Sequence, residues 1–397
     1  MASIITASPR HPALNAGAPD RLAHIGRARQ ALLYGGQPPA GAAPALESWI
    51  ERSWLRCLAS GQRPEQTPFF DLLPAPTLRR TLDANQQLLQ AARPAMDKLG
   101  RAIADTRYFA ILTNGDGVVV DVNGPIDRRD RRADLLTRIG TNLSERQVGT
   151  TAIGAALTEL QPVWLHRGEH FFDANSAYSC AGAPLFGPDG RCVGMLDLTG
   201  IEAAERPELK HLVIQSARNI QNALTVSRPH ALLIRLNWPG QALGDENDGL
   251  VCIDTDGCVT GANQTARQMV PQLNQAASTL HCSDLFALPF DMLFDAARQS
   301  NLHAGAMEVP LWTGLRLHAL PSLPGQRRQP SPLQMAGAGN LAQQGAHNAA
   351  PRPLKELETA LIRKAVDDAR GNVQQAAKAL GVSRATVYRR LGPGKRV

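Results

Sequence analysis

The pattern of hydrophobic and polar positions changes several times along this chain. In Pro44–Gly61 and Pro76–Thr106, apolar residues recur every three or four positions, which predicts helices. From Tyr108 onward, short apolar runs alternate with turn sequences, which predicts strands. Residues 1–43 follow neither pattern, and we expect a loose N-terminus there. The body of the chain is therefore expected to begin with helices and to continue as an α+β fold.

Two hairpins are predicted within this mixed region. Residues 108–123 read as YFAILT, the turn NGDG and then VVVDV, and residues 183–199 read as APLF, GPDG and RCVGMLDLT. Helical patterns lie at Gly149–Glu159 and Arg206–Val226. Strands and helices mixed over this length predict an α+β sensory fold.

A further α+β segment is expected at residues 228–320. It contains GLVCIDTDGCVTGANQTARQMV, which predicts a strand, a TDG turn, a second strand and a helix that begins after Asn263. The later sequence LWTGLRLHAL predicts another strand.

Residues 321–353 have the composition of a flexible linker. They are rich in Pro, Gly, Ala and Gln, contain no acidic residue and show no sustained apolar period. A flexible coil of this length has a root-mean-square reach of roughly 30 Å. The segment that follows is therefore expected to move independently of the body.

Residues 354–397 carry a helix-turn-helix pattern. Gly371 ends a first helix, Asn372 caps a second helix, and Gly381 supplies the turn before a third helix. Ser383 can cap that third helix, which spans Arg384–Leu391. The apolar positions of the first helix are Leu354, Leu357, Leu361, Ile362, Ala365 and Val366.

The positive charge of the protein is concentrated in the same tail. Pro351–Val397 holds 11 Lys and Arg against 4 Asp and Glu, a formal +7 that equals the net charge of the whole chain. The remaining 350 residues carry 31 basic and 31 acidic side chains. An imbalance so localised indicates a polyanionic partner.

The tail sequence LKELETALIRKAVDDARGNVQQAAKALGVSRATVYRRL resembles the DNA-binding domain of the Fis family. The resemblance implies double-stranded DNA as a partner, with Arg384 pairing to guanine in the major groove. It also implies phosphate contacts, and Tyr388 either faces DNA or packs at a dimer interface. The other residues of this expected surface are Ser383, Thr386, Arg389 and Arg390. The alternative is a cationic helical hairpin without a role on DNA.

Residues 44–226, a helical lead-in followed by mixed strands, resemble the GAF domain of the acetoin-catabolism regulator family. The matching motifs are SWLRC, GTNLSERQVGTTAIGAAL, EHF, SCAGAPLFGPDG and GMLDLTG. The resemblance implies a pocket for a small effector between sheet and helices, with hydroxyls from Thr150 and Thr151 and apolar walls from Trp164 and Phe172. Each of these residues also has a structural interpretation, since Thr150 can simply begin a helix and Trp164 can be core.

Residues 228–320 resemble a degenerate PAS domain, which implies either a second sensor or a spacer. Regulators of the acetoin-catabolism family carry an AAA+ ATPase between the sensory body and the DNA-binding tail. Here the sequence GxxxxGK[ST] is absent, and the one Gly-Lys pair lies at Gly394 and Lys395. We therefore expect no ATP-driven activation and no cofactor.

Enzymatic alternatives rest on weaker patterns. His166 and His170 have the spacing of metal ligands on a helix, but Gly168 between them argues against a helix, and we expect no metal site. Cys180 lacks the sequence signature of a nucleophile, and the six cysteines show no CxxC spacing, so reduced thiols are expected. The run DRRDRR at residues 127–132 predicts a solvated loop.

The sequence as a whole predicts a cytoplasmic transcription regulator rather than an enzyme. It shows no apolar run of about 18 residues and no signal-peptide pattern, so no membrane association is expected. One short recognition helix makes few contacts, so a homodimer is expected. Without an ATPase the protein would act by occupying DNA or by contacting RNA polymerase. The alternative is an interaction protein that pairs with a full-length relative and modulates it.

Overall fold

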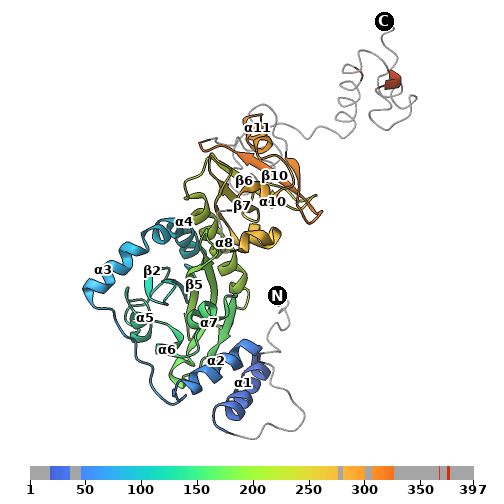
Figure 1. Ribbon diagram of the computed structural model, residues 1–397. Coiled ribbons are helices and arrows are strands. Elements are labelled where there is room, and N and C mark those ends of the chain that lie inside the picture. Colours follow the sequence, from blue (N-terminus) through green and yellow to red (C-terminus); the bar gives the residue numbers. More distant parts are fainter. Residues whose placement is uncertain are drawn as a thin grey trace, which may run out of the picture. The chain divides into compact units, whose positions relative to one another are not determined.

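The computed structural model describes residues 18–35, 46–275, 280–299 and 306–325, together with Val366 and residues 373–375 (Figure 1). The chain divides into two compact units, Met1–Gln326 and Arg327–Val397. The expected DNA-binding residues 383–390 and most of the expected linker lie outside the described residues. Among the described residues, no helix combines the length and the apolar character needed to cross a membrane.

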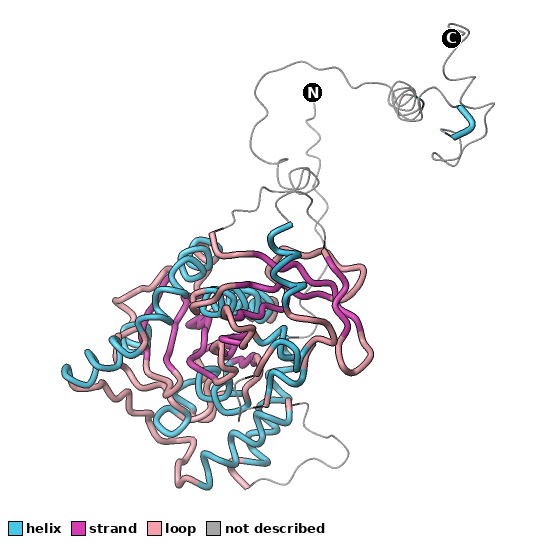
Figure 2. Tube along the Cα trace, turned by 45° about the horizontal axis from the view of Figure 1, so that its top comes forward, coloured by secondary structure: helices cyan, strands magenta, loops and turns pink. Residues whose placement is uncertain are grey.

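A five-stranded antiparallel sheet forms the centre of residues 108–201, and it confirms both predicted hairpins. Its order is β2-β1-β5-β4-β3. The strands are β1 (Tyr108–Asn114), β2 (Val119–Asn123), β3 (Val163–His166), β4 (Tyr178–Phe186) and β5 (Cys192–Ile201). The second hairpin begins at Tyr178, five residues earlier than its apolar run indicated. Nearly every residue of β1, β4 and β5 is buried, because helices or loops cover both faces of the sheet (Figure 2).

Two apolar cores lie on opposite faces of this sheet. One packs against α4 and α8 and includes Leu112 and Leu198, and the other includes Ile111 and Met195 and packs against α2 and α7. The helices are α2 (Ser48–Ala59), α3 (Ala75–Ala84), α4 (Gln86–Ala102), α5 (Arg131–Leu136), α6 (Glu145–Val148), α7 (Ala152–Glu159) and α8 (Leu209–Val226), with short 3₁₀ turns η1 (Arg167–Glu169) and η2 (Asp173–Asn175). The alternation of side chains along the strands separates the two cores.

The N-terminal helix α1 (Ala18–Leu32) corrects the expectation of a loose N-terminus. Its inward face is small, with Ile25 and Ala28 buried beside the guanidinium-bearing Arg29. A face that includes an arginine gives no clear apolar period, so the pattern of hydrophobic positions does not reveal the helix. In the run DRRDRR, residues 127–130 form the expected loop. Only Arg131 and Arg132 depart from it, because they begin α5, which Asp130 caps by accepting a hydrogen bond from the backbone N–H of Arg132 at 2.9 Å.

A second five-stranded antiparallel sheet follows, with the order β8-β7-β6-β10-β9. It contains the predicted strand, turn, strand and helix, and also the predicted later strand. Its elements are β6 (Leu232–Asn237), β7 (Gly249–Ile253), β8 (Val259–Ala262), α9 (Gln264–Met269), η3 (Pro271–Asn274), α10 (Cys282–Leu285), α11 (Asp291–Gln299), β9 (Met307–Pro310) and β10 (Arg316–Ser322). Strand β6 was not expected, although it occupies the middle of the sheet between β7 and β10. Strand β10 ends two residues inside the expected linker.

Helix α8 joins the two sheets. The carbonyl of Thr225 near its end accepts a hydrogen bond from the Cys252 thiol of β7 at 3.4 Å, and the side-chain amide of Asn263 donates to Asn222 at 2.7 Å. The guanidinium of Arg267 in α9 also donates to the carbonyl of Pro188, in the β4–β5 turn, at 2.7 Å. Backbone and side-chain contacts therefore fix the second sheet against α8 and the β4–β5 turn.

Candidate functional site

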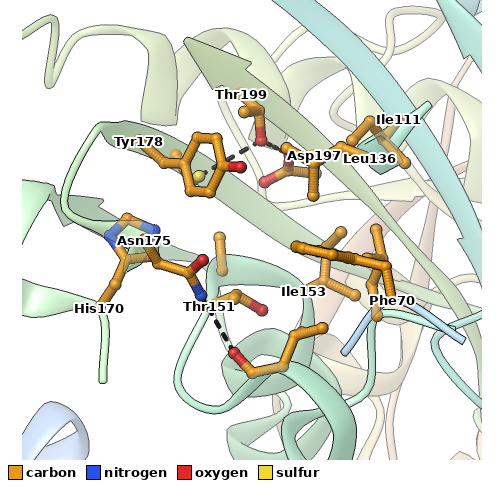
Figure 3. Close-up of a pocket in the computed structure, with 14 residues that line it drawn as sticks. Phe70, Ile111, Leu136, Thr151, Ile153, His170, Asn175, Tyr178, Asp197 and Thr199 are labelled. Carbon is orange, nitrogen blue, oxygen red and sulfur yellow. Dashed lines mark hydrogen bonds between the residues drawn. The ribbon is translucent and has the colours of Figure 1, made fainter. Parts of the chain in front are cut away.

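A cavity lies between the first sheet and helices α5 to α7 (Figure 3). The space open to the centre of a water molecule is about 20 Å³, which is enough for one or two waters. Seven polar or thiol-bearing side chains reach it: Thr151, His170, Asn175, Tyr178, Cys180, Asp197 and Thr199. The apolar part of the wall consists of Phe70, Ile111, Leu136, Leu143, Val148, Ala152 and Ile153.

Asp197 brings a carboxyl group into the middle of the sheet. It lies on β5 between Gly182 of β4 and Ile111 of β1 and is completely buried. One carboxyl oxygen accepts a hydrogen bond from the Thr199 hydroxyl, whereas Oδ1 has no partner among the described residues. Burial raises the pKa of Asp197 to about 7, against the opposing effect of the Thr199 hydrogen bond. Near neutral pH this carboxyl can therefore donate a hydrogen bond as well as accept one.

His170 brings a neutral imidazole to the same cavity. The ring is completely buried, and Nδ1 lies 2.9 Å from the carbonyl oxygen of Arg167. Since a carbonyl only accepts, Nδ1 carries the proton and Nε2 is left as an acceptor. Nε2 has no partner among the described residues. Burial lowers the pKa of His170 to about 4, so the ring is uncharged at neutral pH.

Two buried, unpartnered polar atoms in one cavity call for a ligand or water. Leaving a buried polar group unsatisfied costs about 1–3 kcal/mol. Figure 3 shows the ring of Tyr178 between His170 and Asp197, with its hydroxyl on the side of Asp197. Burial raises the pKa of Tyr178, so its hydroxyl stays protonated and available as a donor. The cavity thus combines hydrogen-bonding groups from His170, Tyr178 and Asp197 with an apolar wall.

The α6–α7 corner and one loop close the cavity. The side-chain amide of Asn175 donates to the carbonyl of Val148 at 3.2 Å, and the Thr151 hydroxyl caps α7 by accepting from the Gly154 N–H at 3.2 Å. Phe70 comes from the loop between α2 and α3. Three main-chain hydrogen bonds hold this loop, at Leu73–Gly140 (3.0 Å), Asn142–Asp71 (2.9 Å) and Asp173–Pro64 (2.9 Å).

Of the four residues expected to contact an effector, Thr151 lines the cavity and the other three do not. The Thr150 hydroxyl lies 2.7 Å from the hydroxyl of Ser53 in α2. Phe172 packs in the core beside Gly149. Trp164 belongs to the apolar core on the opposite face of the sheet.

Sequence reasoning missed Asp197, and it considered His170 only as a metal ligand or as a base beside Cys180. A signal for Asp197 was present, because an acidic residue inside the apolar strand GMLDLTG is unusual for a buried β-strand. His166 does not share the cavity, and its Nδ1 lies 2.7 Å from the Ser179 hydroxyl. No group of three or more metal-ligating side chains occurs within the described part of the chain.

The cysteines are free thiols, four of them buried and two partly buried. Cys180 reaches the cavity and lies 3.3 Å from the Thr199 hydroxyl. Burial and the nearby Asp197 raise the pKa of Cys180 well above its ordinary value. The thiol is therefore protonated, which is unsuitable for a nucleophile.

Two family profiles match the chain. The profile described as "MimR, N-terminal domain" matches residues 23–222, about half of the chain and the whole of the first sheet with its helices. The chain belongs to the MimR N-terminal domain family. In this family member, a second profile, "Bacterial regulatory protein, Fis family", matches residues 353–392. Both matches are regulatory, which confirms the resemblance to transcription regulators with a Fis-type helix-turn-helix.

Three curated relatives of this MimR-domain protein are described as transcription regulators. The acetoin catabolism regulatory protein of Cupriavidus necator is 29% identical over 292 residues, covering 70% of this chain and 42% of the relative. The propane 2-monooxygenase operon activator MimR of Mycolicibacterium goodii is 30% identical over 203 residues, covering 50% of this chain and 33% of the relative. The acetoin dehydrogenase operon activator AcoR of Bacillus subtilis is 30% identical over 169 residues, covering 41% of this chain and 27% of the relative. The matched part is thus less than half the length of each relative.

Solved structures resemble the MimR-domain protein only distantly. The crystal structure of the E. coli DhaR(N)-DhaL complex aligns with 70% of this chain and 100% of that one, at 16% sequence identity and a TM-score of 0.44.

Proposed function

We propose that this protein is a transcription regulator in which a small effector, bound in the cavity of a GAF-like sensor, controls DNA binding by the Fis-type tail. The proposal rests chiefly on one observation: a cavity with two buried, unpartnered polar atoms, from Asp197 and His170, lies in a chain that also carries a Fis-family segment. Binding that satisfies both atoms would stabilise the closed wall.

The effector is a small uncharged molecule. An anion would meet the carboxyl of Asp197, and a buried charge is costly without a partner of opposite sign. The names of the relatives refer to acetoin and to propane, compounds of three or four carbons. A molecule of that size exceeds the cavity's present space for one or two waters, so binding moves the wall outward. We assign that movement to the loop that carries Phe70.

The tail reads DNA through Arg384, with Ser383, Thr386, Arg389 and Arg390 on the phosphates and Tyr388 at the DNA or dimer interface. The protein acts as a homodimer without ATPase activity, since this sequence contains no phosphate-binding GxxxxGK[ST] loop. The PAS-like sheet serves as a spacer or as a second sensor. An alternative function is modulation of a longer relative by hetero-oligomerisation, which the two regulatory matches also support.

A gel shift on the protein's own promoter tests the proposal. We expect the purified protein alone to shift this DNA, and acetoin or propan-2-ol, but not acetate, to change the affinity. Arg384→Ala should weaken binding to the cognate site by about 1–3 kcal/mol per half-site and to random DNA by much less. Arg370→Ala, outside the segment expected to contact DNA in the same tail, is the matched control.

The sensor is tested in the same assay with His170→Phe, and with Trp164→Phe as the control from the opposite face of the sheet. His170→Phe should abolish the effector response, whereas Trp164→Phe should retain it. A shift that requires the addition of a longer relative would support the alternative function instead. An effector response that persists in His170→Phe would show that the effector does not bind in this cavity.

A further inference from the structure

Helix α1 packs against the segment that carries His170. Arg29 of α1 is 9% exposed, and its guanidinium donates hydrogen bonds to the carbonyls of Gly168 (2.8 Å), His170 (2.6 Å) and Phe171 (2.9 Å). It also donates to a carboxylate oxygen of Asp173. One planar side chain therefore binds three backbone carbonyls of residues 168–171 at once.

A second arginine of α1 holds the start of the same segment. One nitrogen of Arg21 donates to both carboxylate oxygens of Glu169, at 2.8 and 3.0 Å, and another nitrogen donates to Glu205. The carboxylate of Glu169 in turn accepts the backbone N–H of His166 at 2.6 Å. The two arginines together fix residues 166–173 at both ends.

The segment between these contacts is strained and tightly enclosed. Arg167 has φ of +51°, a left-handed conformation that is unfavourable for a residue with a side chain. A Cβ at Gly168 would lie 3.1 Å from the Ile25 side chain and 3.3 Å from that of Arg29, so the helix leaves little room there. The carbonyl that orients the imidazole of His170 belongs to Arg167 itself. The position of His170 in the cavity therefore depends on a conformation that α1 helps to hold.

We propose that α1 acts as a clasp on the cavity and that Arg29 is its positioning residue, holding His170 in place for the ligand. This inference rests on the proposed role of the cavity as a ligand site. His170 Nε2 faces the ligand, whereas the backbone of residues 166–173 faces α1. Docking of α1 against this backbone and binding of a ligand in the cavity therefore favour each other. Such coupling is reciprocal: whatever releases α1 weakens ligand binding, and ligand binding holds α1 in place.

The decisive variant is Arg29→Lys, which keeps the positive charge but loses the planar fork of donors. Arg29→Ala removes both, and Arg27→Ala, at an exposed position of the same helix, is the matched control. In the full-length protein, hydrogen exchange of the amides of residues 163–175 should rise at least tenfold for both Arg29 variants. The amides of β1 and β5 should remain protected, which shows that the sheet is intact.

The pKa of His170 gives a second readout that a loss of helix stability alone would not change. Burial holds this pKa near 4 in the native protein, with His166 and Arg29 lowering it further. NMR titration of histidine-labelled protein should show it moving toward 6.5 in Arg29→Lys, although the charge at residue 29 is kept. An unchanged pKa of His170 and unchanged exchange of residues 163–175 in that variant would overturn the clasp.

Acetoin serves as the ligand probe. Its Kd should be at least tenfold higher for Arg29→Lys than for Arg27→Ala, and its addition should slow amide exchange in residues 18–32 of the native protein. Equal Kd values in the two variants would contradict the clasp. If acetoin fails to bind the native protein, the proposed effector class is wrong, and the exchange and pKa measurements still decide whether α1 positions His170.

Discussion

Asp197 and His170 illustrate how burial alone can set the protonation of neighbouring groups in opposite directions. Burial raises the pKa of the carboxyl to about 7 and lowers that of the imidazole to about 4. In both cases the charged form is disfavoured because it loses its hydration. The imidazole is consequently uncharged near neutral pH, whereas the carboxyl is about half ionised at pH 7.

Asp197 should make the stability of the sensor depend on pH. Its pKa in the folded state lies above the value of 3.8 for a free side chain, so the folded protein binds the proton more tightly than the unfolded chain. Stability from this group is complete below pH 4 and is lost as pH rises toward 7, at about 1.4 kcal/mol for each pH unit in that interval. The side chain of Asp197→Asn cannot ionise. We therefore expect the free energy of unfolding of this variant, relative to that of the native protein, to be higher at pH 8 than at pH 4.5.

Urea unfolding of both proteins at the two pH values checks this expectation. Asp121→Asn provides a comparison, because Asp121 is a partly buried carboxyl in the neighbouring strand β2. A stability difference between Asp197→Asn and the native protein that is the same at both pH values would show that Asp197 is not protonated on folding.

At the scale of elements, the corner between α6 and α7 depends on a glycine. Gly149 has φ of +66° and ψ of −160°, a combination that is essentially restricted to glycine. A Cβ there would also lie 2.9 Å from the ring of Phe172. This corner places Thr151 at the start of α7 and Val148 at the end of α6, and both line the cavity.

Gly149→Ala should therefore destabilise the protein by about 1–3 kcal/mol, through backbone strain and a clash. Gly61→Ala is the matched control, because Gly61 also has a positive φ, of +84°, but has nothing within 4 Å of a built Cβ. We expect the Tm to fall further for Gly149→Ala than for Gly61→Ala. An equal fall in Tm for the two variants would show that the Phe172 side chain moves aside without a loss of stability.

The sequence predicted the elements that depend on local pattern. The hairpins at 108–123 and 183–199 and helix α8 each carry their own period and turn residues, so they could be located without knowledge of their neighbours. Helix α1 was missed because ion pairs and carbonyls about 140 residues away in the sequence stabilise it. Strand β6 was missed because its place in the sheet depends on pairing with β10, which lies more than 80 residues later.

The cavity was predictable only as a location. Its position between sheet and helices followed from the family resemblance, and Thr151, one of the four residues expected to contact an effector, lines it. The pairing of Cys180 with Thr199 across β4 and β5, and the turn that brings His170 to the same cavity as Asp197, arise from tertiary structure. Trp164 and Thr150 were selected by residue type, which does not indicate the face of the sheet on which a side chain lies.

At the scale of the whole molecule, the proposed regulator has a sensor and a tail separated by a segment with linker composition. A long Pro- and Gly-rich linker transmits little torque, so an effector would act on DNA affinity mainly through dimerisation and the effective concentration of the second tail. The tail, residues 351–397, should alone bind DNA weakly, with steep salt dependence and no effector response.

Fusing residues 351–397 to an unrelated constitutive dimer should restore the affinity without any effector. Gel shifts of the isolated tail, the fusion and the full-length protein provide the comparison. If the fusion stays weak while the full-length protein binds tightly, the body contacts the DNA or the tail directly, and the linker is more than a tether.

The continuous helix α8 also limits how hybrid sensors can be assembled from this protein. It buries Val213, Ala217 and Ile220 against the first sheet, and its last turn contacts the second sheet through Thr225. Adding or deleting one residue in such a helix rotates everything beyond it by about 100° and shifts it by about 1.5 Å. A graft joined at residue 226 would therefore misalign the two sheets, whereas one joined after Ser322 carries the intact pair to a new output domain.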